Sequence, residues 1–244
     1  MEAQWGLLVL ILILGGGVDQ TLAQSTEKRS PFCEEKARRT ATLDTRGLGA
    51  VYCTTTPILT RPLEGAHASA RPLFYGGVPL AWGVALLLRE DDNYADAYRL
   101  TLAQGATYGL VLGIKHAVGR ARPFVRRALS SRSAHYSSST MTDAYTSFPS
   151  GHAAISATMV ASWSLSHPKW YVWGPGAVWA VGVSLSRLHL GVHYPTDVLV
   201  GAGIGVGMAI LVHQVRETLT PGVVTGEPGS ALRTPPPISV QIRF

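Results

Sequence analysis

Charged residues are scarce in this sequence. Only 15% of its 244 residues are charged, against roughly 25% in an average soluble domain, and 46% are apolar. This balance excludes a disordered chain, and 26 glycines without a three-residue period exclude a collagen-like one. Two cysteines are too few for a disulfide scaffold. The length predicts one compact domain with tails, and the composition favours a helical protein embedded in a membrane.

Acidic residues are almost missing from the middle of the chain. Asp143 is the only acid between Asp96 and Asp197. The same region holds a cluster of cations, which are Lys115, Arg120, Arg122, Arg126, Arg127 and Arg132. Because these cations follow an apolar stretch in one connector, they favour a local anion site over a nucleic-acid groove. The sequence therefore predicts an anionic ligand and no nucleic-acid partner.

The two ends of the chain differ from its middle. Residues 1–23 predict an export signal, with an uncleaved N-terminal anchor as the alternative. The segment 24–71 is then expected on the exported side, where a disulfide between Cys33 and Cys53 can persist. Two unrelated free thiols are the alternative for these cysteines. Residues 216–244 are rich in proline and predict a flexible tail.

Five stretches lack charged residues, and these are 72–88, 100–114, 153–166, 170–186 and 198–215. A membrane-spanning helix needs about 20 mostly apolar residues, with a lower limit near 17. Three stretches reach that limit, and the other two reach it if flanking polar residues lie at the interface. The sequence predicts an all-α, membrane-embedded bundle of five core helices over residues 72–215. Buried helices of a soluble bundle are the alternative.

Five consecutive spans also predict which connectors share a side. The connectors 117–151 and 187–197 should lie at one end of the bundle, on the exported side, and the connectors 89–99 and 167–169 at the other. The connector 89–99 carries more acids than arginines, which runs against the positive-inside rule for this orientation.

The segment from Phe148 to His152 combines a helix start with an ionisable ring. Ser150 is a preferred N-cap residue, and Pro149 stops any helix before it. Free N–H groups of the following turn, including that of Gly151, form an anion site together with the helix dipole. His152 lies in this turn, where it can give a proton to a leaving group. An ordinary helix start is the alternative.

His189, His193 and Asp197 are spaced four residues apart, as metal ligands on one helix face would be. Gly191 and Pro195 interrupt a helix at this point, so no metal site is predicted. Asp197 is instead expected in the first turn of the last helix, accepting a hydrogen bond from Nδ1 of His193. That bond would leave Nε2 free as a nucleophile. A purely structural His–Asp pair is the alternative.

Three cations are candidates for a phosphate clamp. Lys115 ends an apolar stretch, Arg122 precedes Pro123, and Arg187 precedes the His193 segment. If they converge, they hold one dianion, because the planar guanidinium fork suits phosphoryl oxygens. An interfacial lysine and a membrane-surface arginine are the alternative.

Taken in order, these elements resemble the motifs of the type 2 phosphatidic acid phosphatase superfamily. The motifs are K-x6-R-P from Lys115 to Pro123, P-S-G-H from Pro149 to His152, and S-R-x5-H-x3-D from Ser186 to Asp197. All three fit without a gap, and the resemblance covers residues 72–215. It implies a helical bundle that hydrolyses phosphoesters through a phosphohistidine, without a metal or cofactor.

The resemblance also implies a role for each matched residue. His193 would be the nucleophile, with Asp197 orienting it, and His152 the general acid and later the base for water. The residues that would hold the phosphoryl oxygens are Lys115, Arg122, Ser150, Gly151 and Arg187. Five residues have no place in the motifs and are expected on the surface, with head-group binding as the alternative: His116, Arg120, Arg126, Arg127 and His189.

The leading functional prediction is a lipid-phosphate phosphatase of the inner (cytoplasmic) membrane whose site faces the exported, periplasmic side. Its substrate would be a lipid phosphate or diphosphate such as phosphatidate, phosphatidylglycerophosphate, a polyprenyl diphosphate or a lipid A phosphate. A soluble exported acid phosphatase is the second hypothesis, and a vanadium haloperoxidase and an idle anion-binding membrane protein are weaker ones. The sequence carries no signal for an oligomeric state.

Overall fold

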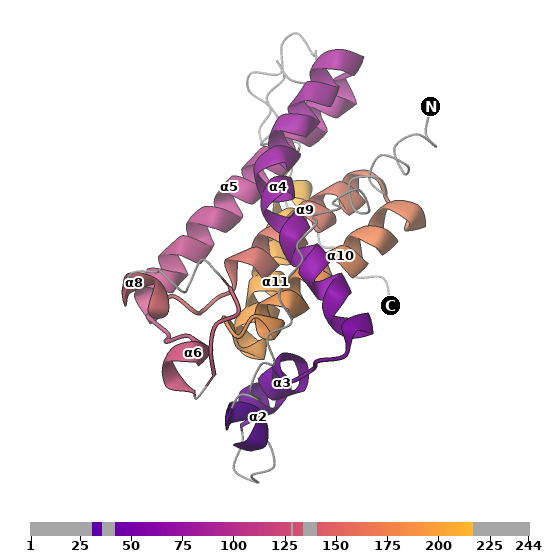
Figure 1. The fold of residues 1–244 in the computed structure, drawn as a ribbon. Helices are drawn as coiled ribbons and strands as arrows, with labels where there is room; N and C mark the ends of the chain where they lie inside the picture. Colours follow the sequence, from indigo (N-terminus) through magenta and orange to yellow (C-terminus); the bar gives the residue numbers. More distant parts are fainter. Residues whose placement is uncertain (1–30, 36–41, 128, 134–140, 217–244) are drawn as a thin grey trace, which may run out of the picture.

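The computed structural model describes residues 31–35, 42–127, 129–133 and 141–216, and these parts are built from helices joined by short loops (Figure 1). In chain order the described helices are α2 (Pro31–Glu35), α3 (Leu43–Tyr52), α4 (Pro57–Leu88), α5 (Asp91–Val118), α6 (Pro123–Arg126), α8 (Met141–Ala144), α9 (Gly151–Ser166), α10 (Trp170–His189) and α11 (Pro195–Gln214). The expected export segment 1–23 and all but the first residue of the expected tail 216–244 lie outside the described residues.

The five long helices α4, α5, α9, α10 and α11 confirm the prediction of an all-α bundle, and each covers one of the five uncharged stretches to within one residue. The main difference is at the start of α4. The stretch 72–88 was delimited by the absence of charge, but the helix begins at Pro57, with proline in its first turn where no intrahelical N–H is needed. Much of the segment 24–71 is therefore helical and continuous with the bundle.

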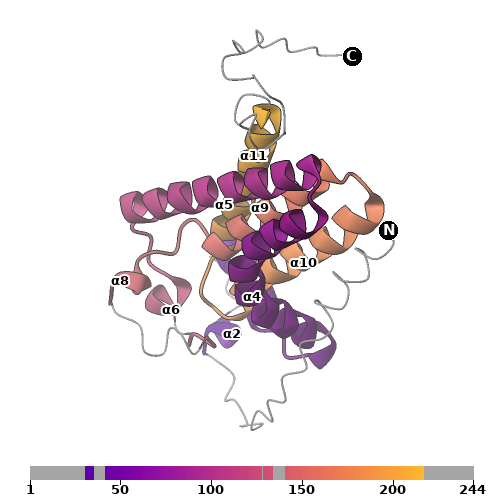
Figure 2. The same ribbon diagram turned by 90° about the horizontal axis from the view of Figure 1, so that it is seen from above.

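Helix α9 lies at the centre of the bundle, packed against α4, α5, α10 and α11 (Figure 2). Two glycines bring α11 close to it. A Cβ atom on Gly201 would overlap the carbonyl oxygen of Ser150, and one on Gly205 would overlap that of Ala154. Small residues at such a contact let two helix backbones approach closely, as helices in lipid commonly do. This approach places the first turns of α9 and α11 side by side.

Large apolar side chains cover much of the outer surface of the bundle. Exposed examples on four different helices are Leu87, Tyr108, Trp173, Val178 and Leu199. Helices α4 and α11 are, by length and composition, long and apolar enough to cross a membrane. An apolar surface of this extent is typical of a protein that meets lipid or another apolar partner.

The connectors meet as the order of the spans predicts. At one end, Arg132 N donates to Leu190 O at 3.0 Å, which joins the connector after α5 to the one after α10. At the other end, Ser166 Oγ donates to Asp96 Oδ1 at 2.6 Å, and His167 Nε2 lies 3.4 Å from Asp96 Oδ2. All the cationic motif segments are thus gathered at the first of these ends.

Helices α2 and α3 lie at the same end of the molecule as α6 (Figure 1). A disulfide joins Cys33 of α2 to Cys53 at the end of α3, so the structure favours pairing over two free thiols. Helix α3 docks on the start of α11, where a Cβ atom on Gly47 would lie 2.8 Å from Cγ of Pro195. Apolar side chains of α2 and α3 share one buried cluster with those of α10 and α11, and it includes Phe32, Leu48, Tyr52, Leu188 and Val198.

Candidate active site

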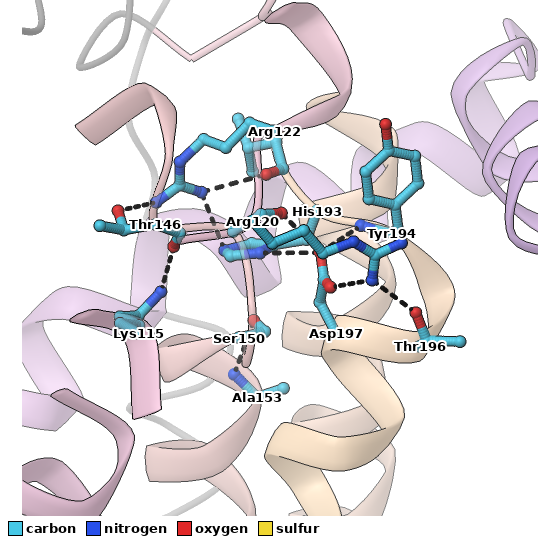
Figure 3. A network of polar contacts seen from close by, with 12 residues as sticks. Lys115, Arg120, Arg122, Thr146, Ser150, Ala153, His193, Tyr194, Thr196 and Asp197 are labelled. Atoms are coloured by element: carbon cyan, nitrogen blue, oxygen red, sulfur yellow. Dashed lines mark hydrogen bonds and ion pairs between the residues drawn. The ribbon is translucent and has the colours of Figure 1, made fainter. Parts of the chain in front are cut away.

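The Ser150–Gly151 turn lies between the ends of two other helices. Ser150 is the N-cap of α9, as expected, and its backbone N–H donates to Asp197 O at 2.8 Å. A Cβ atom on Gly151 would lie 3.9 Å from Cε of Lys115, so the lysine stem passes beside this turn. The Lys115 ammonium donates to Thr146 O at 2.5 Å (Figure 3). The positive end of the α9 dipole and a lysine cation therefore lie side by side.

Arg122 is buried and points at His193 (Figure 3). Its Nε donates to Asp143 O at 2.7 Å, and its Nη1 donates to Val192 O at 3.0 Å. The same Nη1 lies 3.1 Å from His193 Nε2. Because a guanidinium only donates, this ring nitrogen is the acceptor and the imidazole is not protonated there. These contacts hold the guanidinium beside the ring nitrogen of His193.

Asp197 is fully buried in the first turn of α11, as the sequence predicts. Its Oδ2 accepts hydrogen bonds from Ser147 Oγ at 2.6 Å and from Tyr194 N at 2.8 Å. His193 Nδ1 lies 3.6 Å from the same oxygen, which is too long for the expected hydrogen bond, and among the described residues it has no other partner. The carboxylate thus faces the ring nitrogen across a small gap rather than binding it directly.

The surroundings of His193 favour its neutral form. Burial of the imidazole, together with the charges of Arg122 and Lys115, lowers the pKa of His193 to about 3, against the opposing effect of Asp197. A neutral imidazole with a proton on Nδ1 has its lone pair on Nε2, on the side of the cations. This is the form of histidine that acts as a nucleophile.

Arg120 holds the other oxygen of Asp197 (Figure 3). Its Nη1 donates to Asp197 Oδ1 at 2.5 Å, and its Nη2 donates to Asp44 Oδ2 at 2.7 Å. The guanidinium also lies 4.3 Å from the centre of the Tyr194 ring. Partial burial alone would lower the pKa of Arg120, but the hydrogen bond to Asp44 and the charges of both carboxylates raise it. Arg120 is therefore a bridge between α3 and the start of α11.

Asp44 completes this bridge from the α3 side. Its Oδ1 accepts from Thr196 N at 3.0 Å, and its Oδ2 accepts from Thr196 Oγ1 at 2.8 Å. One carboxylate thus binds both the arginine that holds Asp197 and the residue that precedes Asp197. The orientation of the first turn of α11 depends on a helix from the N-terminal segment.

Arg187 and His152 lie against α4. Arg187 donates to Ser186 Oγ from Nε at 3.1 Å and from Nη2 at 2.9 Å, and its Nη2 also contacts Nδ1 of His67. The His152 ring packs edge-on against Phe74, with ring centroids 5.4 Å apart. His152 precedes the apolar stretch 153–166, and burial and then the charge of Arg187 lower its pKa, with a further contribution from His193. His152 thus lies on the α4 side of the site, beside Phe74.

The predicted site residues therefore fall into two groups. Contacts link Arg122 to His193, His193 to Asp197 and Asp197 to Ser150, which precedes Gly151. Lys115 lies beside Gly151 and shares Thr146 with Arg122. His152 and Arg187 form the second group, which contacts α4 through Phe74 and His67. Among the described residues no three potential metal ligands are grouped together. His189 Nδ1 lies 3.4 Å from Arg132 Nη1, while His193 faces Asp197 and Arg122.

Two expectations about residues outside the motifs were wrong. Arg120 was expected on the surface but binds two carboxylates, and His189 is buried beside Arg132. His116 and Arg126 are exposed, as expected. Sequence analysis also missed Asp44 and His67. No local pattern marks them, because their partners lie 76 and 120 positions further along the chain.

The model of the PAP2 superfamily, the type 2 phosphatidic acid phosphatases, matches residues 96–221, which is more than half of the chain. The protein belongs to the PAP2 superfamily. The match begins inside α5, so α2, α3 and α4 lie before it.

Two curated PAP2 relatives match parts of this chain. An undecaprenyl-diphosphatase of Sulfolobus acidocaldarius is 43% identical over 72 residues, which are 30% of this chain and 34% of that protein. A lipid A 1-phosphatase of Rhizobium johnstonii is 33% identical over 103 residues, or 40% of this chain and 38% of that protein. The chain thus spans little more than a third of the length of either relative.

Two solved structures share the fold over most of their length. LpxE of Aquifex aeolicus has a TM-score of 0.55 at 22% identity, covering 72% of this chain and 97% of that one. A transmembrane PAP2 type phosphatidylglycerolphosphate phosphatase of Bacillus subtilis has the same TM-score at 21% identity, covering 89% of this chain and 96% of that one. At this identity the similarity establishes the PAP2 helical fold.

Proposed function

We propose that this PAP2 protein is a membrane lipid phosphatase that removes the terminal phosphate of a lipid phosphate or diphosphate through a phosphohistidine at His193. The observation that carries the proposal is the position of Arg122 Nη1, 3.1 Å from Nε2 of His193. A phosphoryl group in the same place would meet the nucleophile and a guanidinium together. Lys115 and the first turn of α9 flank that position.

In the first step Nε2 of His193 attacks the phosphorus atom, and the bond from phosphorus to the leaving oxygen breaks. The imidazole becomes positively charged, and the Asp197 carboxylate opposite Nδ1 stabilises that charge. His152 donates a proton to the leaving oxygen. Burial and the charge of Arg187 disfavour protonation of His152 in the empty site, and the negative charge of a bound phosphate dianion opposes both effects.

In the second step water hydrolyses the phosphohistidine, and His152 acts as a base instead of an acid. His152 accepts a proton from water, and the water oxygen attacks the phosphorus while the bond to His193 breaks. Inorganic phosphate leaves, and both imidazoles return to their starting states. Lys115, Arg122 and Arg187 supply the positive charge that stabilises the phosphoryl oxygens in both transition states.

The outer surface supports a lipid substrate rather than a soluble ester. Apolar side chains exposed on the bundle, together with α4 and α11, which are long and apolar enough to span a membrane, would let a lipid tail remain in the bilayer. Both curated relatives carry names of enzymes that act on lipid-linked phosphates. The disulfide of α2 and α3 lies at the active-site end, and disulfides persist in oxidising compartments. We therefore place the active site on the exported side of the membrane.

The proposal is tested by trapping the intermediate. Detergent-solubilised protein is mixed with a polyprenyl diphosphate that carries ³²P in its terminal phosphate and is quenched during turnover. We expect protein-bound label that is stable to base and released by acid, as a phosphohistidine is. His193→Ala should carry no label and should have lost turnover, with its helical circular dichroism unchanged. Normal turnover by His193→Ala would refute the proposal.

A further inference from the structure

One face of α4 borders the active site. His67, Arg71 and Phe74 are spaced by four and then three residues, so they lie on the same side of this helix. His67 contacts Arg187, and Phe74 packs against His152. Because the residues on both sides of Arg71 touch active-site groups, Arg71 faces the same site, one turn from each of them.

Arg71 brings an accessible positive charge to this place. It is exposed, and its charge acts on His152. Arg71 also directly precedes the uncharged stretch 72–88, so it lies where the apolar part of α4 begins. A lipid head group would occupy this level when its tail is in the bilayer. Since His152 is the proposed acid for the leaving oxygen, Arg71 lies on the leaving-group side of the phosphoryl group.

His67 adds a hydrogen-bond donor beside Arg71. The Arg187 guanidinium only donates, so Nδ1 of His67 accepts from it and the ring hydrogen is on Nε2. The Nε2–H group can therefore donate to an oxygen of a second anion. Arg187 therefore links this second anion position to the position of the transferred phosphoryl group, which Arg187 is proposed to hold.

We propose that His67 and Arg71 bind the inner phosphate of a lipid diphosphate, the one that stays on the lipid, while the terminal phosphate is transferred to His193. This inference rests on the proposed function. The bond between His193 Nε2 and the terminal phosphorus forms as the bond from that phosphorus to the bridging oxygen breaks. The electron pair remains on the bridging oxygen, so negative charge grows on the lipid monophosphate that leaves. Arg71 and His67 stabilise that charge.

A lipid monophosphate offers no such anion. Its leaving group is an alcohol, so Arg71 has no phosphate to bind and His152 must supply a full proton. The inference therefore makes α4 a determinant of substrate class: its His67–Arg71 pair favours diphosphates over monophosphates.

The test compares two substrates in the same detergent micelles, a polyprenyl diphosphate and the polyprenyl monophosphate of the same chain length. Phosphate release is measured for the wild type, for Arg71→Gln and for the control Arg61→Gln, which removes another exposed arginine of α4. In Arg71→Gln we expect the ratio of kcat/KM for diphosphate to that for monophosphate to fall about 10–100-fold, the size of a lost charge-assisted hydrogen bond. Arg61→Gln should keep the wild-type ratio.

The outcomes separate this inference from the proposed function. An unchanged ratio in Arg71→Gln, or a wild type that hydrolyses the monophosphate but not the diphosphate, overturns the role of α4 and leaves the phosphatase proposal intact. A wild type that hydrolyses neither lipid overturns both. If Arg71→Gln loses its helical circular dichroism, His67→Gln provides the same comparison, with a smaller expected fall in the ratio.

Discussion

Arg120 and Arg122 stand two positions apart in one connector, yet the structure gives them opposite surroundings. Arg120 binds the carboxylates of Asp44 and Asp197, so its charge is neutralised by the protein. Arg122 donates to the backbone carbonyls of Asp143 and Val192, and its Nη1 lies 3.1 Å from His193 Nε2. Arg120 thus holds the carboxylate of Asp197, whereas Arg122, the arginine of the K-x6-R-P motif, lies beside the proposed nucleophile.

The part of the chain that matches the PAP2 superfamily and the helices before it also have different roles. Every proposed reacting group comes from the part that matches the PAP2 superfamily. The helices before it, α2 to α4, supply residues that hold those groups: Asp44 acts on Asp197 through Arg120, His67 contacts Arg187, and Phe74 packs on His152. The chemistry is thus carried by motifs, and its geometry depends on a segment without motifs.

Replacing Arg122 should reduce activity more than replacing Arg120 or Asp44. In Arg122→Gln we expect kcat/KM to fall about 10²–10³-fold, because one preorganised donor to the transition state is removed. The measurement is phosphate release from a lipid phosphate in micelles. Arg126→Gln is the matched control, since it removes an exposed arginine of the same connector. Equal losses in the two variants would show that total positive charge matters and the position of Arg122 does not.

Replacing Arg120 should change turnover without changing phosphate binding. We expect kcat of Arg120→Gln to fall about 10–100-fold, since Asp197 loses the hydrogen bond that fixes its orientation and small displacements of catalytic groups are costly. The inhibition constant of inorganic phosphate should stay at its wild-type value, and Arg120→Lys should retain part of the activity. A parallel rise in that constant would mean that Arg120 binds phosphate directly.

Replacing Asp44 should have the smallest effect of these substitutions. Asp44→Asn keeps the shape of the side chain but removes the charge that pairs with Arg120, so we expect a loss in kcat of about 3–10-fold. Because both residues act through Asp197, the double variant Asp44→Asn/Arg120→Gln should lose about as much kcat as Arg120→Gln alone. If the kcat losses of the two single variants instead multiply in the double variant, α3 influences the site by a route other than Arg120 and Asp197.

The fold was predictable to the extent that it depends on apolar runs. Stretches without charge located the five long helices, and the order of the spans placed the connectors 117–151 and 187–197 together. The start of α4 was not predictable from charge, because helix geometry continues through residues 57–71 although they are more polar. As a result the sequence-based interpretation placed His67 and Arg71 in an exported segment outside the bundle.

The residues of the candidate site likewise divide into those that the sequence could identify and those that it could not. Its motif residues are found within short windows, where a proline, an N-cap serine or a four-residue spacing has a local meaning, as for Ser150 and Asp197. Asp44, Arg120 and His67 have no such local meaning. Each is an ordinary polar residue until folding brings its partner within hydrogen-bond distance.

The sequence alone therefore determined the helical class, the chemistry of the motif residues and the end of the bundle at which they gather, because each of these follows from local composition and spacing. The tertiary structure decided which of two neighbouring arginines binds the carboxylates of Asp44 and Asp197, and which helix completes the site. Those outcomes depend on carboxylates and imidazoles far away in the chain, since electrostatic neutralisation requires contact in space and not proximity in sequence.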